Sequence, residues 1–428
     1  MDSIQHFPPL YRKTLSRHFK MFAILGYYIF NDSDKHFLIK YGRLIFFHCY
    51  FFVTVLFQVL YLFYGQRQGA SLLEIIIAVP FSVLFIQAFA KLPILVVKRS
   101  LLRGVIEEMA DLWPVSTAGD EEKTRVMQVR LRELKIVDNF LFFFSVFGVN
   151  FYNTIPLTIS LKSFFSESEN LYMYPLQMWI PFTTTTVLQY VIVSTVQITF
   201  SALLYISLNL TCELLLVTLV NDLCILLHLL QIDIENVISE AIPTVYDSGV
   251  GTSIDNYASE VEILHQKQAN QRDYEKIKQL LKTHQKLMSI VERLNDIFGV
   301  IIFNSACTSS ILICCFCFLT TTARGMDAIM YILSMIGMVF TIFNFAWPGQ
   351  LLCDASAGIS DAAYKCLWYE RDQKIKKSIA IIMTRAQEPC YLTALGFNNM
   401  TYETLVAVLK GAYSFLSLLR QVYQESEM

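Results

Sequence analysis

Long apolar runs separated by polar stretches dominate the sequence. Seven of these runs are long enough for a helix to cross the roughly 30 Å hydrocarbon core of a bilayer. They lie at residues 41–64, 71–97, 136–161, 177–205, 295–322, 327–347 and 402–424. The pattern predicts an all-α, polytopic membrane protein with seven transmembrane helices.

The last run has two stripes. Its apolar positions recur at helical spacing: Leu405, Val408, Leu409, Ala412, Phe415, Leu416, Leu419 and Tyr423. Its polar positions share another narrow face: Glu403, Lys410, Ser414, Ser417, Gln421 and Gln424. Polar groups that faced lipid would cost several kcal/mol in all, so this face should see water. We interpret it as the lining of a pore; a helix at the membrane interface or in a cytosolic bundle is the alternative.

Basic residues set the expected orientation, because Lys and Arg concentrate in loops that stay in the cytosol. Residues 1–43, 98–135, 232–293 and 348–400 together carry 28 of them, against only Arg67, Lys162 and Arg324 in the intervening loops. The N-terminus is therefore expected inside and the C-terminus outside.

Helical periodicity continues beyond the fourth span as far as Leu230, and resumes from Tyr257 into the fifth span. We expect these extensions to form a cytosolic anchor bundle with the segment after span six. The run Ala346-Trp347-Pro348-Gly349 is interpreted as a helix break, and residues 98–135 as a solvated connection.

These expectations divide the chain into six parts. They are a cytosolic N-terminus with a short interfacial helix (1–40), helices 1–4 (41–205), cytosolic extensions with a loop at 243–255 (206–294), helices 5–6 (295–347), an anchor region (348–400) and the pore helix with the outer C-terminus (401–428).

Composition narrows the function classes. Hydrophobic residues make up 54 % and charged residues 16 % of the chain, against about 25 % charged in soluble proteins. A net charge of −2 without a basic tail predicts no nucleic-acid partner. The ten cysteines lie mostly in apolar runs, and neither a phosphate-binding loop nor a hydrolase motif occurs. We therefore expect no enzyme activity, no cofactor and no metal.

The C-terminal third resembles the insect odorant receptor family. The resemblance is carried by SAGISDAAYKCLWY at 356–369, LTALGFNNMTYETLVAVLK at 392–410 and AYSFLSLLRQ at 412–421. The number of spans and their orientation also match. The signature of the related gustatory receptors is met only loosely, by Ala412-Tyr413 and Gln421-Val422, which favours the odorant branch.

The resemblance implies a tetrameric, ligand-gated, non-selective channel for monovalent and divalent cations, with four last spans around the pore. It implies a volatile small-molecule ligand and a multi-pass subunit in the plasma membrane of a sensory dendrite. An odorant coreceptor is the expected partner in a hetero-tetramer. Coreceptors have an extended inner loop between spans four and five; because the stretch from Leu230 to Tyr257 is short, this chain resembles a tuning subunit.

Matching the last span to the family implies a hydrophobic gate at Leu418 and Val422, with Gln421 beside the ion path. A ring of apolar side chains closes a pore by excluding water. On a helical wheel Gln421 lies within the polar stripe, whereas Leu418 and Val422 lie roughly 80° and 120° from its centre.

The family's ligand pocket lies in the outer half of the membrane, between spans two and six. The residues that this chain offers there are Phe81, Phe85, Phe147, Asn150, Phe151, Tyr190, Ser194, Thr308, Ile311, Tyr331 and Met335. Such a lining suits a small volatile held by shape and apolar burial. Each of these residues is also a candidate for plain helix packing.

Two other classes remain open. A G-protein-coupled receptor would need an outside N-terminus and the Asp-Arg-Tyr or Asn-Pro-x-x-Tyr motifs, which the sequence lacks. A secondary transporter would show paired repeats with broken helices, for which Pro80 and Pro181 are the only hints.

Overall fold

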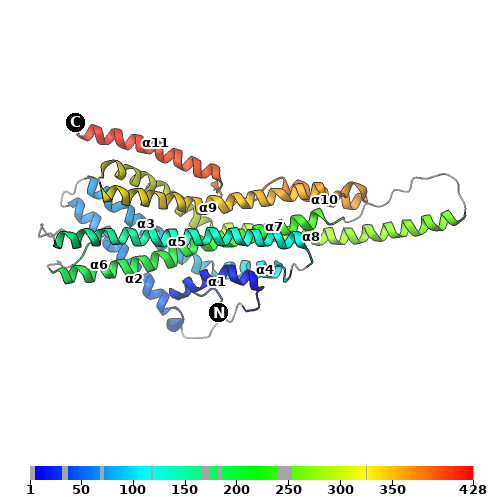
Figure 1. Ribbon diagram of the computed structural model, residues 1–428, viewed down its shortest axis with the longest axis horizontal. Coiled ribbons are helices and arrows are strands. Elements are labelled where there is room, and N and C mark those ends of the chain that lie inside the picture. The colour runs from blue at the N-terminus through cyan, green and yellow to red at the C-terminus, as the bar shows by residue number, and fades with distance from the viewer. Residues whose placement is uncertain are drawn as a thin grey trace.

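The computed structural model describes residues 5–30, 37–67, 72–116, 119–165, 174, 176–181, 186–238, 253–323 and 325–427. Long helices lie side by side along the longest dimension of the molecule (Figure 1). The helices are α1 (Pro9–Ile24), α2 (Phe37–Arg67), α3 (Leu72–Val97), α4 (Arg99–Leu112), α5 (Glu121–Phe165), α6 (Val187–Leu204), a π-helical turn η2 (Tyr205–Leu210), α7 (Thr211–Glu235), α8 (Ser253–Thr322), α9 (Met326–Lys365), a 3₁₀ turn η3 (Trp368–Glu370), α10 (Gln373–Ala386) and α11 (Tyr402–Glu427). Strands β1 (Thr393–Ala394) and β2 (Asn398–Asn399) form an antiparallel hairpin before α11.

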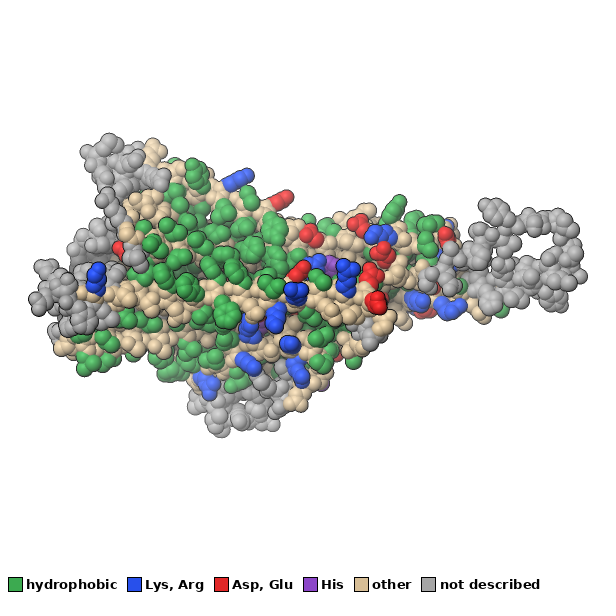
Figure 2. All heavy atoms as spheres, viewed as in Figure 1, with side chains coloured by type: hydrophobic (Ala, Val, Ile, Leu, Met, Phe, Trp, Pro, Cys, Tyr) green, Lys and Arg blue, Asp and Glu red, His purple; other side chains and the backbone are tan. Residues whose placement is uncertain are grey.

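Five helical stretches among the described residues are long and apolar enough to cross a membrane: Tyr41–Tyr64, Glu121–Thr158, Val187–Glu235, Lys267–Thr322 and Asp327–Glu370. Apolar side chains cover one end of the molecule, and acidic and basic side chains gather towards the other (Figure 2). The prediction of an all-α polytopic membrane protein is confirmed. The two remaining predicted spans correspond to α3, with a shorter apolar stretch at Ser82–Val97, and to the amphipathic α11.

Helix α9 corrects the predicted break at Ala346–Gly349, because it runs without interruption from Met326 to Lys365. Pro348 removes one backbone donor, a cost that neighbours can offset when they pack on both sides of the proline. Phe345 and Leu352, which flank it, are buried. The anchor region after residue 348 is thus a direct continuation of a membrane helix.

The inner connection at 98–135 is also corrected. It is mostly helical, since α4 occupies much of it and α5 begins at Glu121. Helix α4 buries one apolar face through Leu102, Val105, Ile106 and Met109. This spacing of three, one and three is a helical pattern that the acidic residues nearby obscured.

The short N-terminal helix expected within residues 1–40 is α1, at Pro9–Ile24. Tyr11, Leu15, His18 and Phe22 form its buried face. The Tyr11 hydroxyl donates to the Ile106 carbonyl at 3.2 Å, and burial raises the pKa of Tyr11 well above its ordinary value, so this donor stays protonated. Helix α1 is therefore tied to the bundle through α4.

The fourth helix begins at Val187, after the predicted start at 177, and continues through η2 into α7 as far as Glu235. The fifth helix, α8, is continuous from Ser253 to Thr322, so residues 253–255 of the predicted 243–255 loop are helical. The rest of that loop lies outside the described residues. The two extensions, the end of α9 and α10 share one large apolar core with α1 and α4.

Candidate functional site

Helix α11 meets the rest of the chain along one face only (Figure 1). Leu405, Val408 and Ala412 join an apolar cluster with residues of α8 and α9, and Leu416, one turn further on, is also buried. The helix then leaves the body of the molecule (Figure 1), and most side chains on its other described faces are exposed.

Four of the five predicted pore residues lie on these exposed faces. Ser414, Ser417 and Gln421 are exposed, and the Leu418 side chain is 60 % exposed. The Ser414 and Ser417 hydroxyls donate to the carbonyls of Lys410 and Tyr413, at 3.1 Å and 3.2 Å. The helix thus satisfies its own hydroxyls, as a helix beside water or lipid can. The side chain of Val422 lies outside the described ones.

The base of α11 is held tightly. Asn295 in α8 holds the start of the hairpin: its side chain accepts from Thr393 N in β1 and donates to Tyr391 O, both at 2.9 Å. Gly349 in α9 abuts the Met400 carbonyl so closely that a Cβ atom there would clash with it. Movements of α8 or α9 must therefore reach the foot of α11.

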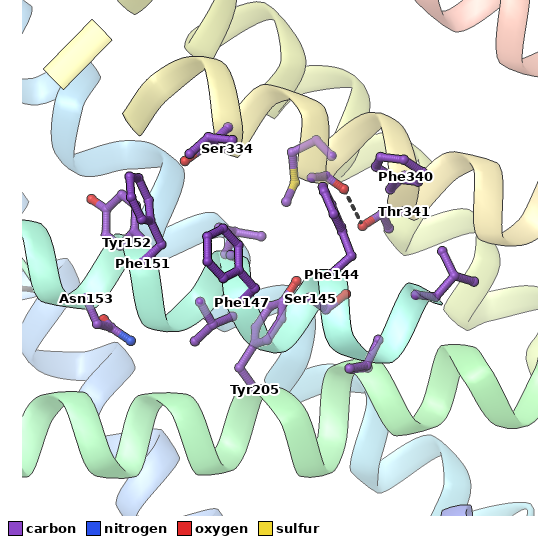
Figure 3. Close-up of a pocket in the computed structure, with 18 of the residues that line it drawn as sticks. Phe144, Ser145, Phe147, Phe151, Tyr152, Asn153, Tyr205, Ser334, Phe340 and Thr341 are labelled. Carbon is purple, nitrogen blue, oxygen red and sulfur yellow. Dashed lines mark hydrogen bonds between the residues drawn. The ribbon is translucent and has the colours of Figure 1, made fainter. Parts of the chain in front are cut away.

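A cavity of about 190 Å³, open to the surface on one side, lies among α3, α5, the η2–α7 junction, α8 and α9 (Figure 3). Phe144, Phe147 and Phe151 point into it from α5, and Phe340 approaches from α9. Its other lining residues are Leu84, Phe85, Leu141, Ser145, Gly148, Val149, Tyr152, Asn153, Leu176, Tyr205, Leu210, Glu213, Phe316, Met330, Leu333, Ser334, Gly337, Met338, Thr341 and Asn344.

Three of the residues expected to bind ligand, Phe85, Phe147 and Phe151, line this cavity together. Tyr331 and Met335 belong instead to the apolar cluster beside it. The other described candidates lie elsewhere: Asn150 donates to Val146 O, Tyr190 packs against Tyr174, Ser194 is buried, Thr308 bonds within α8, and Ile311 is exposed. The side chain of Phe81 lies outside the described ones.

The inner end of the cavity holds a buried charge network that the sequence analysis missed. Lys91 Nζ lies 2.6 Å from Glu213 Oε1 and 2.5 Å from Asn209 Oδ1. The Asn344 amide donates to the other Glu213 oxygen at 3.3 Å. Lys91 is fully buried, and Glu213 is 2 % exposed. A lysine inside an apolar run was the signal that could have found it, because such a charge requires a partner.

One apolar cluster connects the cavity to α11. Phe316, Met330 and Met338 line the cavity and also pack in the cluster that contains Leu405 and Ala412. Side chains packed together in this way pass a displacement on to their neighbours. A displacement of the cavity wall would therefore reach the packed face of α11.

Comparisons with known proteins identify the family and the relatives that this chain resembles. The sequence profile of the family described as "7tm Odorant receptor" matches residues 71–413. Odorant receptor 85b of Drosophila melanogaster is 31 % identical over 34 % of this chain and 38 % of its own. Odorant receptor 10 of Aedes albopictus is 31 % identical over 34 % and 39 %. Each alignment thus spans about two fifths of the relative.

Among solved structures, the olfactory receptor OR5 of Machilis hrabei in complex with eugenol superposes with a TM-score of 0.76, at 16 % identity, over 96 % of this chain and 98 % of that one. At this identity the likeness establishes the fold. Leu418, Gln421 and Val422 lie beyond the region matched by the family profile.

Proposed function

This chain belongs to the odorant receptor family, and on that premise we propose that it is the odorant-tuning subunit of a ligand-gated, non-selective cation channel. Its ligand is a small volatile compound bound in the cavity between α5 and α9. A better fit of the ligand to the open state shifts the closed–open equilibrium.

The cavity carries this proposal. A volume of about 190 Å³ is below the roughly 300–1,000 Å³ of sites for drug-sized ligands, so the cavity suits a smaller molecule. Its aromatic lining favours an apolar body, at about 25 cal/mol for each Å² buried. The solved OR5 complex contains eugenol, a small aromatic compound, which agrees in size and character.

The pore in this proposal is assembled from α11 of four subunits. Ser414, Ser417 and Gln421 face water, and Leu418 with Val422 forms the apolar constriction that excludes water in the closed state. The open faces of α11 support this assignment, because a helix with such exposed polar and apolar positions gains partners in an oligomer.

An odorant coreceptor supplies the other subunits of the hetero-tetramer, and the assembly lies in the plasma membrane of a sensory dendrite. The short sequence between Leu230 and Tyr257 supports the tuning role rather than the coreceptor role.

Whole-cell current in cells that express this chain, with and without an insect coreceptor, tests the proposal. A panel of volatile esters, alcohols, terpenoids and aromatics is applied while G-protein signalling is blocked. We expect a rapid cation current that requires the coreceptor, and a standing leak or altered gating in Leu418→Ala. Surface expression of both subunits with no current for any compound would contradict the channel function.

A further inference from the structure

Helix α1 carries a basic groove that takes no part in the odorant cavity or the pore. The groove has a volume of about 460 Å³ and runs along the exposed side of α1, where Arg12, Lys13, Ser16 and Lys20 line it. These positions share one face of the helix, because they follow one another at spacings of one, three and four. Figure 2 shows basic side chains gathered where Figure 1 places α1.

The charges of this groove are not balanced within the described part of the chain. Arg12, Lys13 and Lys20 form no ion pair there and no side-chain hydrogen bond, whereas Arg17, on another side of α1, binds Asp138 at 2.8 Å. Helix α1 itself contains no Asp or Glu. Three cations that line one groove create a positive potential, which attracts an anion.

The end of α1 lies beside the ends of two membrane helices. The Tyr27 hydroxyl donates to Leu95 O, near the end of α3, at 2.8 Å. The Arg43 guanidinium, near the start of the first span, donates to Ala23 O at 3.2 Å. We take these ends of α2 and α3 as the cytosolic ones, because basic residues concentrate on that side of a membrane. The groove then lies at the inner leaflet, where anionic lipids gather.

The order of side chains along α1 matches the layers of a membrane surface. Ile24 and Tyr28, at the end nearest the spans, are 40 % and 41 % exposed, and apolar and aromatic side chains of this kind lie at the boundary between acyl chains and headgroups. Lys20 follows one turn away. Arg12 lies about 12 Å further along the helix, so a headgroup that fills the groove must project from the bilayer surface.

We propose that this groove binds the headgroup of an inner-leaflet phosphoinositide, a lipid that carries phosphates on its inositol ring. Arg12, Lys13 and Lys20 bind the phosphates, while Ile24 and Tyr28 contact the acyl chains. The single net negative charge of phosphatidylserine is too small to balance three cations, whereas a phosphorylated inositol ring carries several. An acidic protein segment would complement the same charges, but it would leave the exposed apolar residues at the membrane end without a partner.

Binding of short-chain lipids tests the proposal. The purified full-length chain in detergent is titrated with dioctanoyl phosphatidylinositol bisphosphate, dioctanoyl phosphatidylserine, dioctanoyl phosphatidylcholine and free inositol trisphosphate, and thermophoresis reports binding. We expect the bisphosphate lipid to bind about tenfold more tightly than phosphatidylserine. Its affinity should fall as salt rises, because salt screens exposed charges. Free inositol trisphosphate should bind more weakly than the lipid, because it lacks acyl chains.

Variants assign the binding to the groove. The triple variant Arg12→Gln/Lys13→Gln/Lys20→Gln removes its three cations. Each cation beside an anionic lipid contributes about a fivefold factor in affinity, so we expect a loss of about 100-fold. If melting shows that the triple variant does not fold, Lys13→Gln/Lys20→Gln changes only two exposed side chains and should lose about 25-fold.

The matched control removes the same charge elsewhere. Lys374→Gln/Lys376→Gln/Lys377→Gln takes three cations from α10, which lies away from α1 (Figure 1), and should bind as the unchanged chain does. Equal affinity in the groove variants and the unchanged chain, an equal loss in the α10 variant, or no preference for the bisphosphate lipid over phosphatidylserine would overturn the proposal. Binding of free inositol trisphosphate as tight as that of the lipid would also overturn it, because the ligand would then be a soluble phosphate.

Discussion

The inner bundle and the outer half of the molecule are both helical, but they are built differently. In the inner bundle α7 is buried on all sides, since every residue from Thr211 to Leu227 is buried. In the outer half, Phe143 and Leu188 are 65 % and 70 % exposed. Water drives apolar surfaces together around the bundle, whereas lipid gives helices no such drive. The inner bundle is thus a fixed frame, whereas the outer half can leave a cavity and an α11 that packs along one face.

The largest expected effect comes from the charge pair between these regions. Lys91→Met leaves Glu213 buried without its cation and should lower the free energy of unfolding by about 3–5 kcal/mol. The double variant Lys91→Met/Glu213→Leu should recover most of this loss. Lys98→Met is the control, because its partner Asp296 is 56 % exposed at the side chain, and an exposed pair contributes about 0–1 kcal/mol. Thermal unfolding of purified protein measures all three. A stable Lys91→Met would show that the pair does not hold the two regions together.

Core truncation gives the next largest difference. Leu215 is fully buried in α7 and Leu418 is 60 % exposed in α11. Leu215→Ala should lower the free energy of unfolding by about 3 kcal/mol through lost burial and a cavity, whereas Leu418→Ala should leave it nearly unchanged and alter only the current. Chemical denaturation and whole-cell recording together make the comparison. Equal loss of stability in both variants would mean that α11 is packed like the core.

Two glycines of α9 test how firmly the foot of α11 is held. Gly349→Ala places a Cβ atom against the Met400 backbone carbonyl, which cannot swing away, so we expect a loss of about 1–3 kcal/mol and altered gating. In Gly358→Ala the new Cβ meets the flexible end of Gln231 at 2.7 Å. The gain from alanine in a helix, about 0.5–1 kcal/mol, should offset that contact. Melting temperatures and ligand-evoked currents measure both, and a fully tolerated Gly349→Ala would refute the close contact.

The smallest effect concerns the ligand alone. Phe144 lines the cavity, and its neighbour Phe143 is 65 % exposed on the outer surface. Phe144→Ala should raise the half-maximal ligand concentration about tenfold, or about 1.4 kcal/mol, because it removes apolar contact. Phe143→Ala should shift it little. Dose–response curves with the most effective compound provide the measurement, and a reversed order would place the ligand on the lipid side of α5.

The sequence predicted a helix correctly where the spacing of residues within that one helix decides where it extends. The extensions of the fourth and fifth helices follow from apolar spacing, and α7 and α8 continue through them. The break at Pro348 was predicted wrongly, because a proline's local cost is small beside the packing of a forty-residue helix on its neighbours. Helix α4 was overlooked because residues 98–135 were interpreted as a solvated connection, although the apolar residues from Leu102 to Met109 have helical spacing.

The sequence by itself determined the class of protein and the two faces of α11, because hydropathy and helical spacing depend only on residues close together in the chain. Only the tertiary structure decided which aromatic residues share the cavity, and that Lys91 meets Glu213 and Asn344. Those three residues come from α3, α7 and α9, and lie 122 and 131 positions apart along the chain. Such contacts depend on how the helices pack against one another, and the spacing of neighbouring residues along the chain does not predict this packing.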